Sequence, residues 1–173
     1  MCIRDSPKPS YTRTARNKTR EIYTEEEAEA LEIGKASVLR EGADASIIAC
    51  GVMVERALEA AETLAAKGVD TMVIDMHTIK PIDREAIIRA ASSGAIVTAE
   101  DHSVMGGLGS AVAEVLVEEA PTMMRMIGVR DKFGESGSPM DIMDKMGLTS
   151  ENIASKLEEL LSLIHISEPT RLV

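Results

Sequence analysis

The segment EDHSVMGGLGS holds most of the residues whose types and spacing could do chemistry. Its glycines, Gly106, Gly107 and Gly109, stand directly before a helical pattern, and amides at the amino end of a helix can bind a phosphate. The spacing lacks the third glycine of the dinucleotide fingerprint, and the carboxylates of Glu100 and Asp101 would repel an anion. We therefore expect a structural turn in which one of these carboxylates accepts hydrogen bonds from the glycine amides, with phosphate binding as the alternative.

Other reactive residue types are scarce. His102 is the one residue placed as a general acid–base, because His77 ends an apolar run without a clear partner. Cys50 also follows an apolar run, as a packed small hydrophobe does. Cysteine and histidine are not spaced as metal ligands. Glu100 and Asp101 are adjacent, so on a strand they point to opposite faces and cannot form a glycosidase-type pair. The residues alone predict an incomplete active site.

Composition and charge narrow the class of protein. The chain has 173 residues, of which 45% are hydrophobic and 28% charged, as in one ordinary globular domain. Aromatic residues make up only 2%, so we expect a core of aliphatic side chains and methionine. A formal net charge of −10 argues against a nucleic acid or an anionic membrane as partner. The sequence has neither an apolar run of spanning length nor a secretory leader, so we expect a cytoplasmic protein.

The two ends differ in character from the middle. Written as codons, MCIRDS at residues 1–6 and LSLIHI at residues 161–166 translate the two strands of one inverted run of roughly seventeen nucleotides. Such a run resembles an adapter from sequencing-library preparation, and SEPTR at residues 167–171 looks like its continuation. We expect residues 1–6 and 161–173 to be adapter-derived, with a natural amphipathic tail as the alternative, and the true start to lie upstream of Pro7.

Strand and helix patterns alternate between these ends. Tyr11 to Arg16 looks like a strand without a partner, and Thr24 to Glu27 is a capping-box pattern that starts either a short helix through Leu31 or an extended linker. Asp83 and Ser138 stand where helix caps are expected. Apolar runs predict strands at 37–40, 45–50, 69–76, 95–99 and 123–127, and helical spacing predicts helices at 54–67, 84–91, 108–116, 139–146 and 150–160.

Helices between successive strands predict parallel pairing with helices on both faces of the sheet. We therefore expect an α/β fold, a three-layer α/β/α sandwich with a mixed, mostly parallel sheet of about five strands. The short link between the first two strands, residues 41–44, suits a hairpin. That hairpin would make the first strand antiparallel and place it at an edge of the sheet.

Four longer motifs occur in order between residues 33 and 160: REGADASIIACG, VIDMHTIKPID, AIVTAEDHSVMGGLGSAVAEVL and GVRDKFGESGSPMDIMDKMGLTSENI. Together they resemble the C-terminal domain of thiamine-diphosphate-dependent transketolases, most closely the split forms in which this half is a separate subunit. The synthases of 1-deoxy-xylulose 5-phosphate share EDH…GG…GSAV and are one alternative, although FGESGSP and MGLTSENI look more like transketolase. A noncatalytic binding or dimerisation module is the other alternative.

The resemblance implies a transferase of the pentose phosphate pathway, which moves a two-carbon ketol unit between sugar phosphates. The complete enzyme would use thiamine diphosphate and Mg²⁺, held in the family by other domains, so this chain would bind neither and be inactive alone. It would contribute dimer contact and active-site support and no catalytic residue. The implied partner is an N-terminal thiamine-diphosphate-binding domain or subunit, in a homo-oligomer or a heterotetramer.

The resemblance also divides the chain. Residues 7–32 correspond to the end of the pyrimidine-binding domain with its linker, and residues 33–160 to the C-terminal domain. Within the first part, Arg16 falls where the family carries an arginine that binds the phosphate of the sugar substrate, and a guanidinium fork suits a phosphate. A solvated basic stretch is the alternative. Structural or interface roles carry over to the motif positions Glu100, Asp101, His102, Gly106, Gly107 and Gly109.

Overall fold

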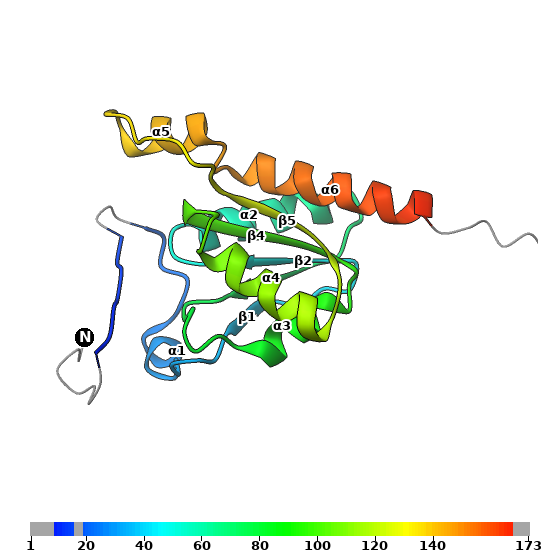
Figure 1. Ribbon diagram of the computed structural model, residues 1–173, viewed down its shortest axis with the longest axis horizontal. Helices are drawn as coiled ribbons and strands as arrows, with labels where there is room; N and C mark the ends of the chain where they lie inside the picture. Colours follow the sequence, from blue (N-terminus) through cyan, green and yellow to red (C-terminus); the bar gives the residue numbers. More distant parts are fainter. Residues whose placement is uncertain (1–8, 16–18, 168–173) are drawn as a thin grey trace, which may run out of the picture.

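A five-stranded sheet forms the centre of the protein. The computed structural model describes residues 9–15 and 19–167. The strands lie in the order β1-β3-β2-β4-β5, and β1 alone runs antiparallel to its neighbour (Figure 1). The predicted mixed sheet with an antiparallel edge strand is therefore confirmed. The strands are β1 Ser37–Arg40, β2 Ala45–Ala49, β3 Thr71–Asp75, β4 Ala95–Ser103 and β5 Met123–Val129.

Helices cover both faces of the sheet, as the alternating pattern predicts. Helices α2 (Met53–Ala65) and α6 (Ser150–Ser167) pack on one face, and α3 (Arg84–Ala91) and α4 (Leu108–Glu119) pack on the other. Two short helices, α1 (Glu25–Glu29) and α5 (Pro139–Met146), lie beside the ends of the strands (Figure 1). The fold is the expected three-layer α/β/α sandwich.

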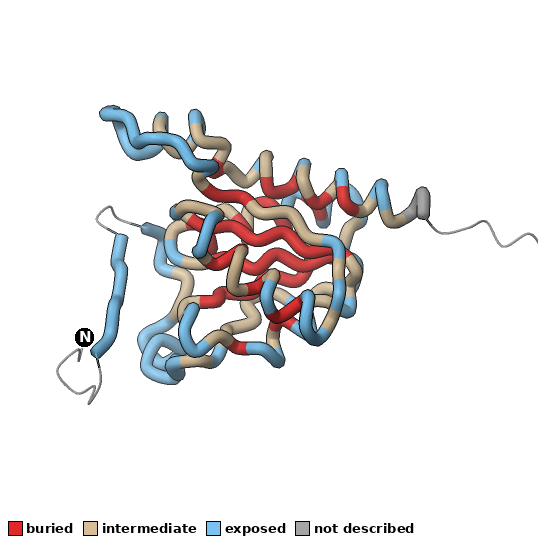
Figure 2. The backbone as a smooth tube through the Cα atoms, viewed as in Figure 1, coloured by how far each residue is buried: buried red, intermediate tan, exposed pale blue. Residues whose placement is uncertain are grey.

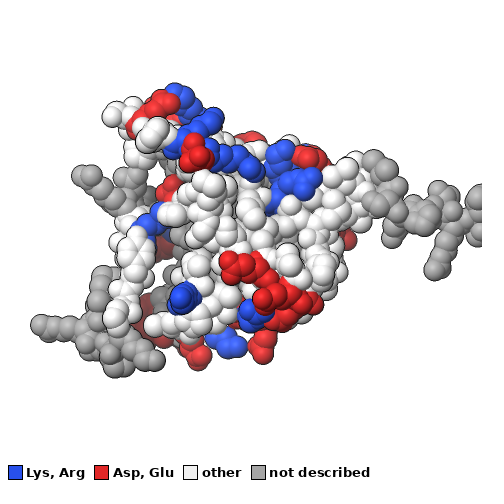
Figure 3. All heavy atoms as spheres, viewed as in Figure 1, with Lys and Arg blue, Asp and Glu red and all other residues white. Residues whose placement is uncertain are grey.

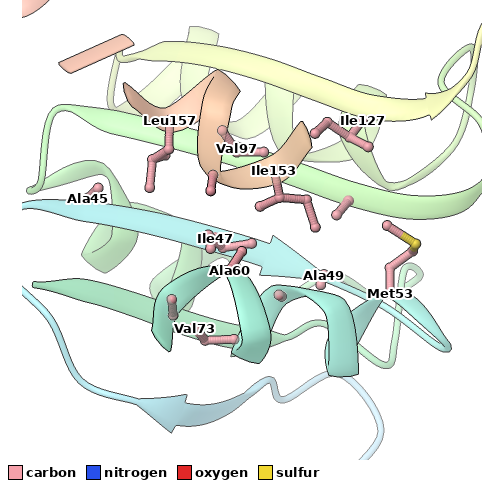
Figure 4. Close-up of a cluster of buried hydrophobic side chains, with 14 of the residues drawn as sticks. Ala45, Ile47, Ala49, Met53, Ala60, Val73, Val97, Ile127, Ile153 and Leu157 are labelled. Atoms are coloured by element: carbon pink, nitrogen blue, oxygen red, sulfur yellow. The ribbon is translucent and has the colours of Figure 1, made fainter. Parts of the chain in front are cut away.

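The core is aliphatic and has two halves, one on each face of the sheet. Each central strand contributes side chains to both halves. Successive side chains of a strand point to opposite faces, so Ile47 packs with α2 and α6 whereas Ile48 packs with α3 and α4. Both are fully buried, as the red strands in Figure 2 show, and each contributes roughly 2–3 kcal/mol through burial. Figure 4 shows the first half, where Met53 of α2 and Ile153 and Leu157 of α6 pack against the sheet. A slip of one residue would move every side chain of a strand to the other half of the core, so the packing of both halves fixes the register of the sheet.

The predicted hairpin between the first two strands is wrong. β1 is an antiparallel edge strand, but its partner is β3, which lies between β1 and β2. The crossover through α2 places β3 directly beside β2, and the link from β1 to β2 must pass the start of β3. Gly42 permits this passage, because a Cβ there would lie 2.2 Å from the carbonyl carbon of Thr71.

Most element boundaries match the sequence patterns. The capping box of Thr24 and Glu27 is present at α1, and Asp83 and Ser138 cap α3 and α5. Four elements are longer than predicted: α4 and β5 by two or three residues, and β4 and α6 by more. β4 continues through Ser103, and α6 continues to Ser167. The sequence LSLIHIS has no helix breaker and keeps apolar residues at helical spacing, which explains the longer α6.

The segment before α1 differs from the prediction. Residues 9–15 are exposed and form no strand, because no described strand pairs with them. Arg16 lies outside the described residues. No described helix combines the length and the apolar character needed to cross a membrane.

Candidate functional site

The carboxyl ends of the parallel strands carry most of the polar residues singled out above. In this strand order, β2 and β4 are neighbours whose following chains leave in opposite directions, and ligands of open α/β sheets bind at such a point. Cys50 follows β2, and Glu100 to Ser103 form the last part of β4. This edge of the sheet is therefore the candidate site.

Glu100 closes the amino end of α4. Its side chain is 1% exposed, and its two oxygens accept hydrogen bonds from the backbone N–H groups of Leu108 at 2.7 Å and Gly109 at 2.8 Å. The cap residue of the helix, Gly107, has no side chain to do this, so the strand supplies the cap. Glu100 is the carboxylate that accepts from the turn, and one of its two amide partners belongs to a glycine, Gly109. These two amides, which a phosphate would need, already hold a carboxylate.

Each glycine of the turn lies where a side chain would be unfavourable, and the geometric reason differs from one glycine to the next. A Cβ on Gly107 would lie 2.0 Å from a carboxylate oxygen of Glu100, and one on Gly109 would lie 2.9 Å from Met126 on β5. Gly106 instead adopts a φ of +75° in open space. Gly128 on β5 was not singled out by its sequence pattern, yet a Cβ there would lie 2.8 Å from the carbonyl oxygen of His102. These glycines let β4, β5 and α4 approach closely.

Asp101 and His102 stand apart from the Glu100 cap. The carbonyl oxygen of Asp101 accepts a hydrogen bond from the guanidinium of Arg13 at 2.7 Å, which holds the 9–15 segment against the end of β4. His102 is exposed, and its Nδ1 lies 3.1 Å from the carbonyl oxygen of Ser103. In the described part of the chain, no carboxylate, hydroxyl or thiol side chain hydrogen-bonds to His102. The structure thus brings Glu100 and the glycines together and leaves His102 outside.

A second polar cluster at the same edge was missed by the sequence patterns. Tyr23 donates a hydrogen bond to Asp75 Oδ2 at 2.7 Å, while Asp75 is only 6% exposed. Burial raises the pKa of Asp75 above its ordinary value, and burial likewise raises the pKa of Tyr23. Asp75 Oδ1 and His77 Nε2 are buried without a partner among the described residues. The available signal was an aspartate ending an apolar run, VIDM.

This cluster attaches the segment before β1 to the domain. Tyr23 lies before α1, whereas Asp75 ends β3, so their hydrogen bond joins residues 52 positions apart. Asp83 makes a second attachment, because its Oδ2 accepts the backbone N–H of Ala36 at 2.8 Å. These contacts are structural, and no serine, threonine, cysteine or lysine side chain hydrogen-bonds to either carboxylate in the described chain.

Cys50 is packed, as predicted. Its side chain lies against the α3 and α4 half of the core. Burial, together with the nearby charge of Glu100, raises the pKa of its thiol to about 12. Over the described residues, no group of three or more histidine, cysteine, aspartate or glutamate side chains could hold a metal ion. In the candidate site, the polar side chains Glu100 and Asp75 hold neighbouring segments to the edge of the sheet.

Large apolar side chains stand exposed at this edge. Phe133 in the loop after β5 is 98% exposed, Tyr11 in the 9–15 segment 88%, and Met105 in the loop before α4 61%. The 9–15 segment, α1 and α5 lie on the same side of the domain in Figure 1. Single exposed apolar residues are ordinary, but several on one edge are typical of a surface that another chain segment covers.

Comparison with known proteins extends these observations. The profile of the family described as "Transketolase, C-terminal domain" matches residues 34–153. A 6-deoxy-6-sulfo-D-fructose transketolase subunit from Clostridium sp. is 47% identical over 152 residues, which are 87% of this chain and 47% of that protein. A putative transketolase C-terminal section from Methanocaldococcus jannaschii is 43% identical over 152 residues, covering 87% of this chain and 48% of that protein.

Solved structures of transketolases also match this chain. A split-gene transketolase, described as an inactive β4 tetramer, matches with a TM-score of 0.81 and 46% identity over 86% of this chain and 48% of that one. A transketolase from Leishmania mexicana has a TM-score of 0.59 at 20% identity and shares the fold, covering 75% of this chain and 18% of its own. The chain spans about half the length of the relatives it matches first. By fold and by sequence, the chain belongs to the family of transketolase C-terminal domains.

Proposed function

We propose that this chain is the C-terminal half of a two-carbon ketol transferase that acts on sugar phosphates once its thiamine-diphosphate-binding half is supplied. The bidentate cap that Glu100 places on α4 carries this proposal. It commits the buried carboxylate and the helix amides at the carboxyl edge to holding β4 against α4. An edge whose polar groups are used internally suits a supporting domain better than a catalytic one.

The cofactor would be held elsewhere in the complete enzyme. Thiamine diphosphate supplies a stabilised carbanion when bound, and its diphosphate needs Mg²⁺ and several donors. The described residues of this chain do not fit that group, since they include no metal-binding cluster and the amides of Leu108 and Gly109 are taken. The role of this domain is therefore to hold the cofactor-binding half in place.

The exposed edge gives the expected position of that half. Tyr11, Met105, Phe133 and Met140 stand at the same end of the domain, each at least half exposed. The 9–15 segment lies at this end, where Arg13 holds it to β4. We infer that this edge contacts an N-terminal domain or subunit within an oligomer, either a homo-oligomer or a heterotetramer. In this reading, residues 7–32 are the end of the pyrimidine-binding domain and its linker.

Arg16 is the substrate contact of this proposal. Its position in the sequence matches that of an arginine that binds the sugar phosphate in the family, so in the assembled enzyme its guanidinium would bind the phosphate of the sugar. In the assembled enzyme, Arg16→Ala should raise KM for a phosphorylated donor while Arg20→Ala leaves it unchanged. An equal effect of both substitutions would favour a solvated basic stretch without a specific ligand.

Activity measurements test the function directly. The 173-residue chain, supplied with thiamine diphosphate and Mg²⁺, should not convert xylulose 5-phosphate and ribose 5-phosphate, whereas the completed enzyme should. Turnover by the chain alone would contradict the proposal. Cytoplasmic location and the adapter origin of the two ends stay predictions. Recovery of the uninterrupted gene tests the second of these.

One second function has a specific observation in its favour. A 1-deoxy-D-xylulose-5-phosphate synthase from Geobacter sulfurreducens is 41% identical over 144 residues, although these are only 23% of that protein. The split transketolase relatives are more similar and correspond to a larger share of their own chains. An assay of the completed enzyme with pyruvate and glyceraldehyde 3-phosphate decides between the two, because only the synthase consumes that pair.

A further inference from the structure

A small basic cavity lies between the end of β5, the carboxyl end of α5 and the first turns of α6. It has a volume of about 170 Å³ and lies at a different place from the Glu100 cap. Four cationic side chains line it, together with the amide side chain of Asn152, and no carboxylate does. The four cations are Arg130, Lys132, Lys145 and Lys156.

This concentration of positive charge is unusual for the protein. The chain carries 29 acidic and 19 basic residues, yet the lining holds four of the basic ones and none of the acidic ones. Figure 3 shows Lys and Arg side chains gathered along the α5 and α6 side of the molecule. Like charges placed together cost free energy unless an anion offsets them, so the cavity favours a negatively charged occupant.

The internal partners of the four cations leave room for such an occupant. Lys145 pairs with Glu135, and Lys156 pairs with Glu159 at 2.6 Å, but both pairs are solvent-exposed and exposed pairs contribute little. Arg130 donates to the carbonyl oxygen of Met126 at 3.0 Å. Among the described residues, no carboxylate oxygen lies within 4 Å of the charged groups of Arg130 or Lys132.

Size decides which kind of anion fits. Pockets for drug-sized ligands span about 300–1,000 Å³, so about 170 Å³ suits a single anionic group better than a whole nucleotide. A guanidinium fork and several ammonium groups together match the oxygens and double charge of a phosphate. We propose that this cavity is a binding site for a phosphate-type dianion, either inorganic phosphate or the phosphate end of a small sugar phosphate. The site goes beyond the proposed function and does not depend on it.

Backbone NMR titration of the full chain provides the test. Gly128 and Gly147 line the cavity, so their amide signals should shift when inorganic phosphate replaces chloride at constant ionic strength. The double substitution Arg130→Gln and Lys132→Gln should weaken binding by at least about tenfold, since each removes one unit charge beside the ligand. Lys35→Gln with Lys67→Gln is the matched control, because it removes the same charge at exposed sites outside the lining and should leave binding unchanged.

Further ligands identify the chemistry that is recognised. Ribose 5-phosphate should shift the same two glycines and ribose should not. Tighter binding of the sugar phosphate than of phosphate would assign the former as ligand, and equal binding would assign the latter. Three results would overturn the proposal. The first is that the shifts are confined to Gly107 and Gly109, and the second is that both double substitutions weaken binding equally. The third is that an oligoglutamate peptide binds and phosphate does not. Unchanged thermal unfolding of the variants shows that the lost binding is not lost folding.

Discussion

The carboxylate of Glu100 accepts the backbone N–H of Leu108 at 2.7 Å and so joins the end of β4 to the start of α4. The helix has no side-chain cap of its own, and the negative charge stands where the helix dipole is positive. The charged, buried acceptor makes this junction a stabilising element of the carboxyl edge.

Replacing Glu100 should therefore destabilise the fold. Glu100→Ala leaves the N–H groups of Leu108 and Gly109 buried without an acceptor, which should lower the free energy of unfolding by about 2–4 kcal/mol. Urea denaturation followed by circular dichroism measures the loss. Asp101→Ala is the control, because the Arg13 contact at that position uses the backbone oxygen, and it should stay within about 0.5 kcal/mol. Equal effects of the two substitutions would contradict this account of the cap.

The glycines of the same turn should differ in their tolerance of a side chain. Gly107→Ala places a methyl group 2.0 Å from the Glu100 carboxylate and should cost more than about 2 kcal/mol of stability. Gly106→Ala meets open space and should cost only the left-handed conformation, about 1–2 kcal/mol. Thermal unfolding of both variants ranks them. A Gly106 variant less stable than the Gly107 variant would show that backbone strain outweighs the steric contact.

The fold was largely predictable because its signals are local. Periodicity placed the main strands and helices, and the charge of Glu100 beside the glycine turn predicted the cap. The pairing of β1 was not predictable in this way, because it depends on where α2 delivers β3 and on the close passage at Gly42. The Tyr23 and Asp75 contact was missed for a similar reason, since it joins residues far apart in sequence.

The buried carboxylate of Asp75 should make stability depend on pH. Burial raises its folded pKa above the ordinary 3.8, so the folded state binds the proton more tightly than the unfolded state. Its contribution to the free energy of unfolding is fully present below the ordinary pKa of 3.8, and it is lost as the pH rises through the higher pKa of the folded state. The unfolding free energy of the wild type minus that of Asp75→Asn should therefore fall over the pH range above 3.8. Urea denaturation of both proteins across this range checks the sign, and a rise would refute it.

The thiol of Cys50 should be unreactive in the folded protein. With a pKa of about 12, roughly one thiol in ten thousand is ionised at pH 8, and the thiolate is the reactive form. In a Cys2→Ser variant, a chromogenic disulfide reagent should react slowly under native conditions and fully in urea. Rapid stoichiometric reaction of the native protein would show that Cys50 is not packed and that the pKa of its thiol is not raised.

A domain replacement tests the central claim most directly. Residues 9–160 would replace the matching part of the Clostridium sp. subunit, to which this chain is 47% identical, and ketol transfer would be measured with the other components of that enzyme, thiamine diphosphate and Mg²⁺. Because this domain supports the cofactor-binding half and supplies no cofactor ligand, the chimera should turn over substrate while the chain alone does not. Turnover by the chain alone, or none by a chimera that assembles and binds the cofactor, would contradict the account.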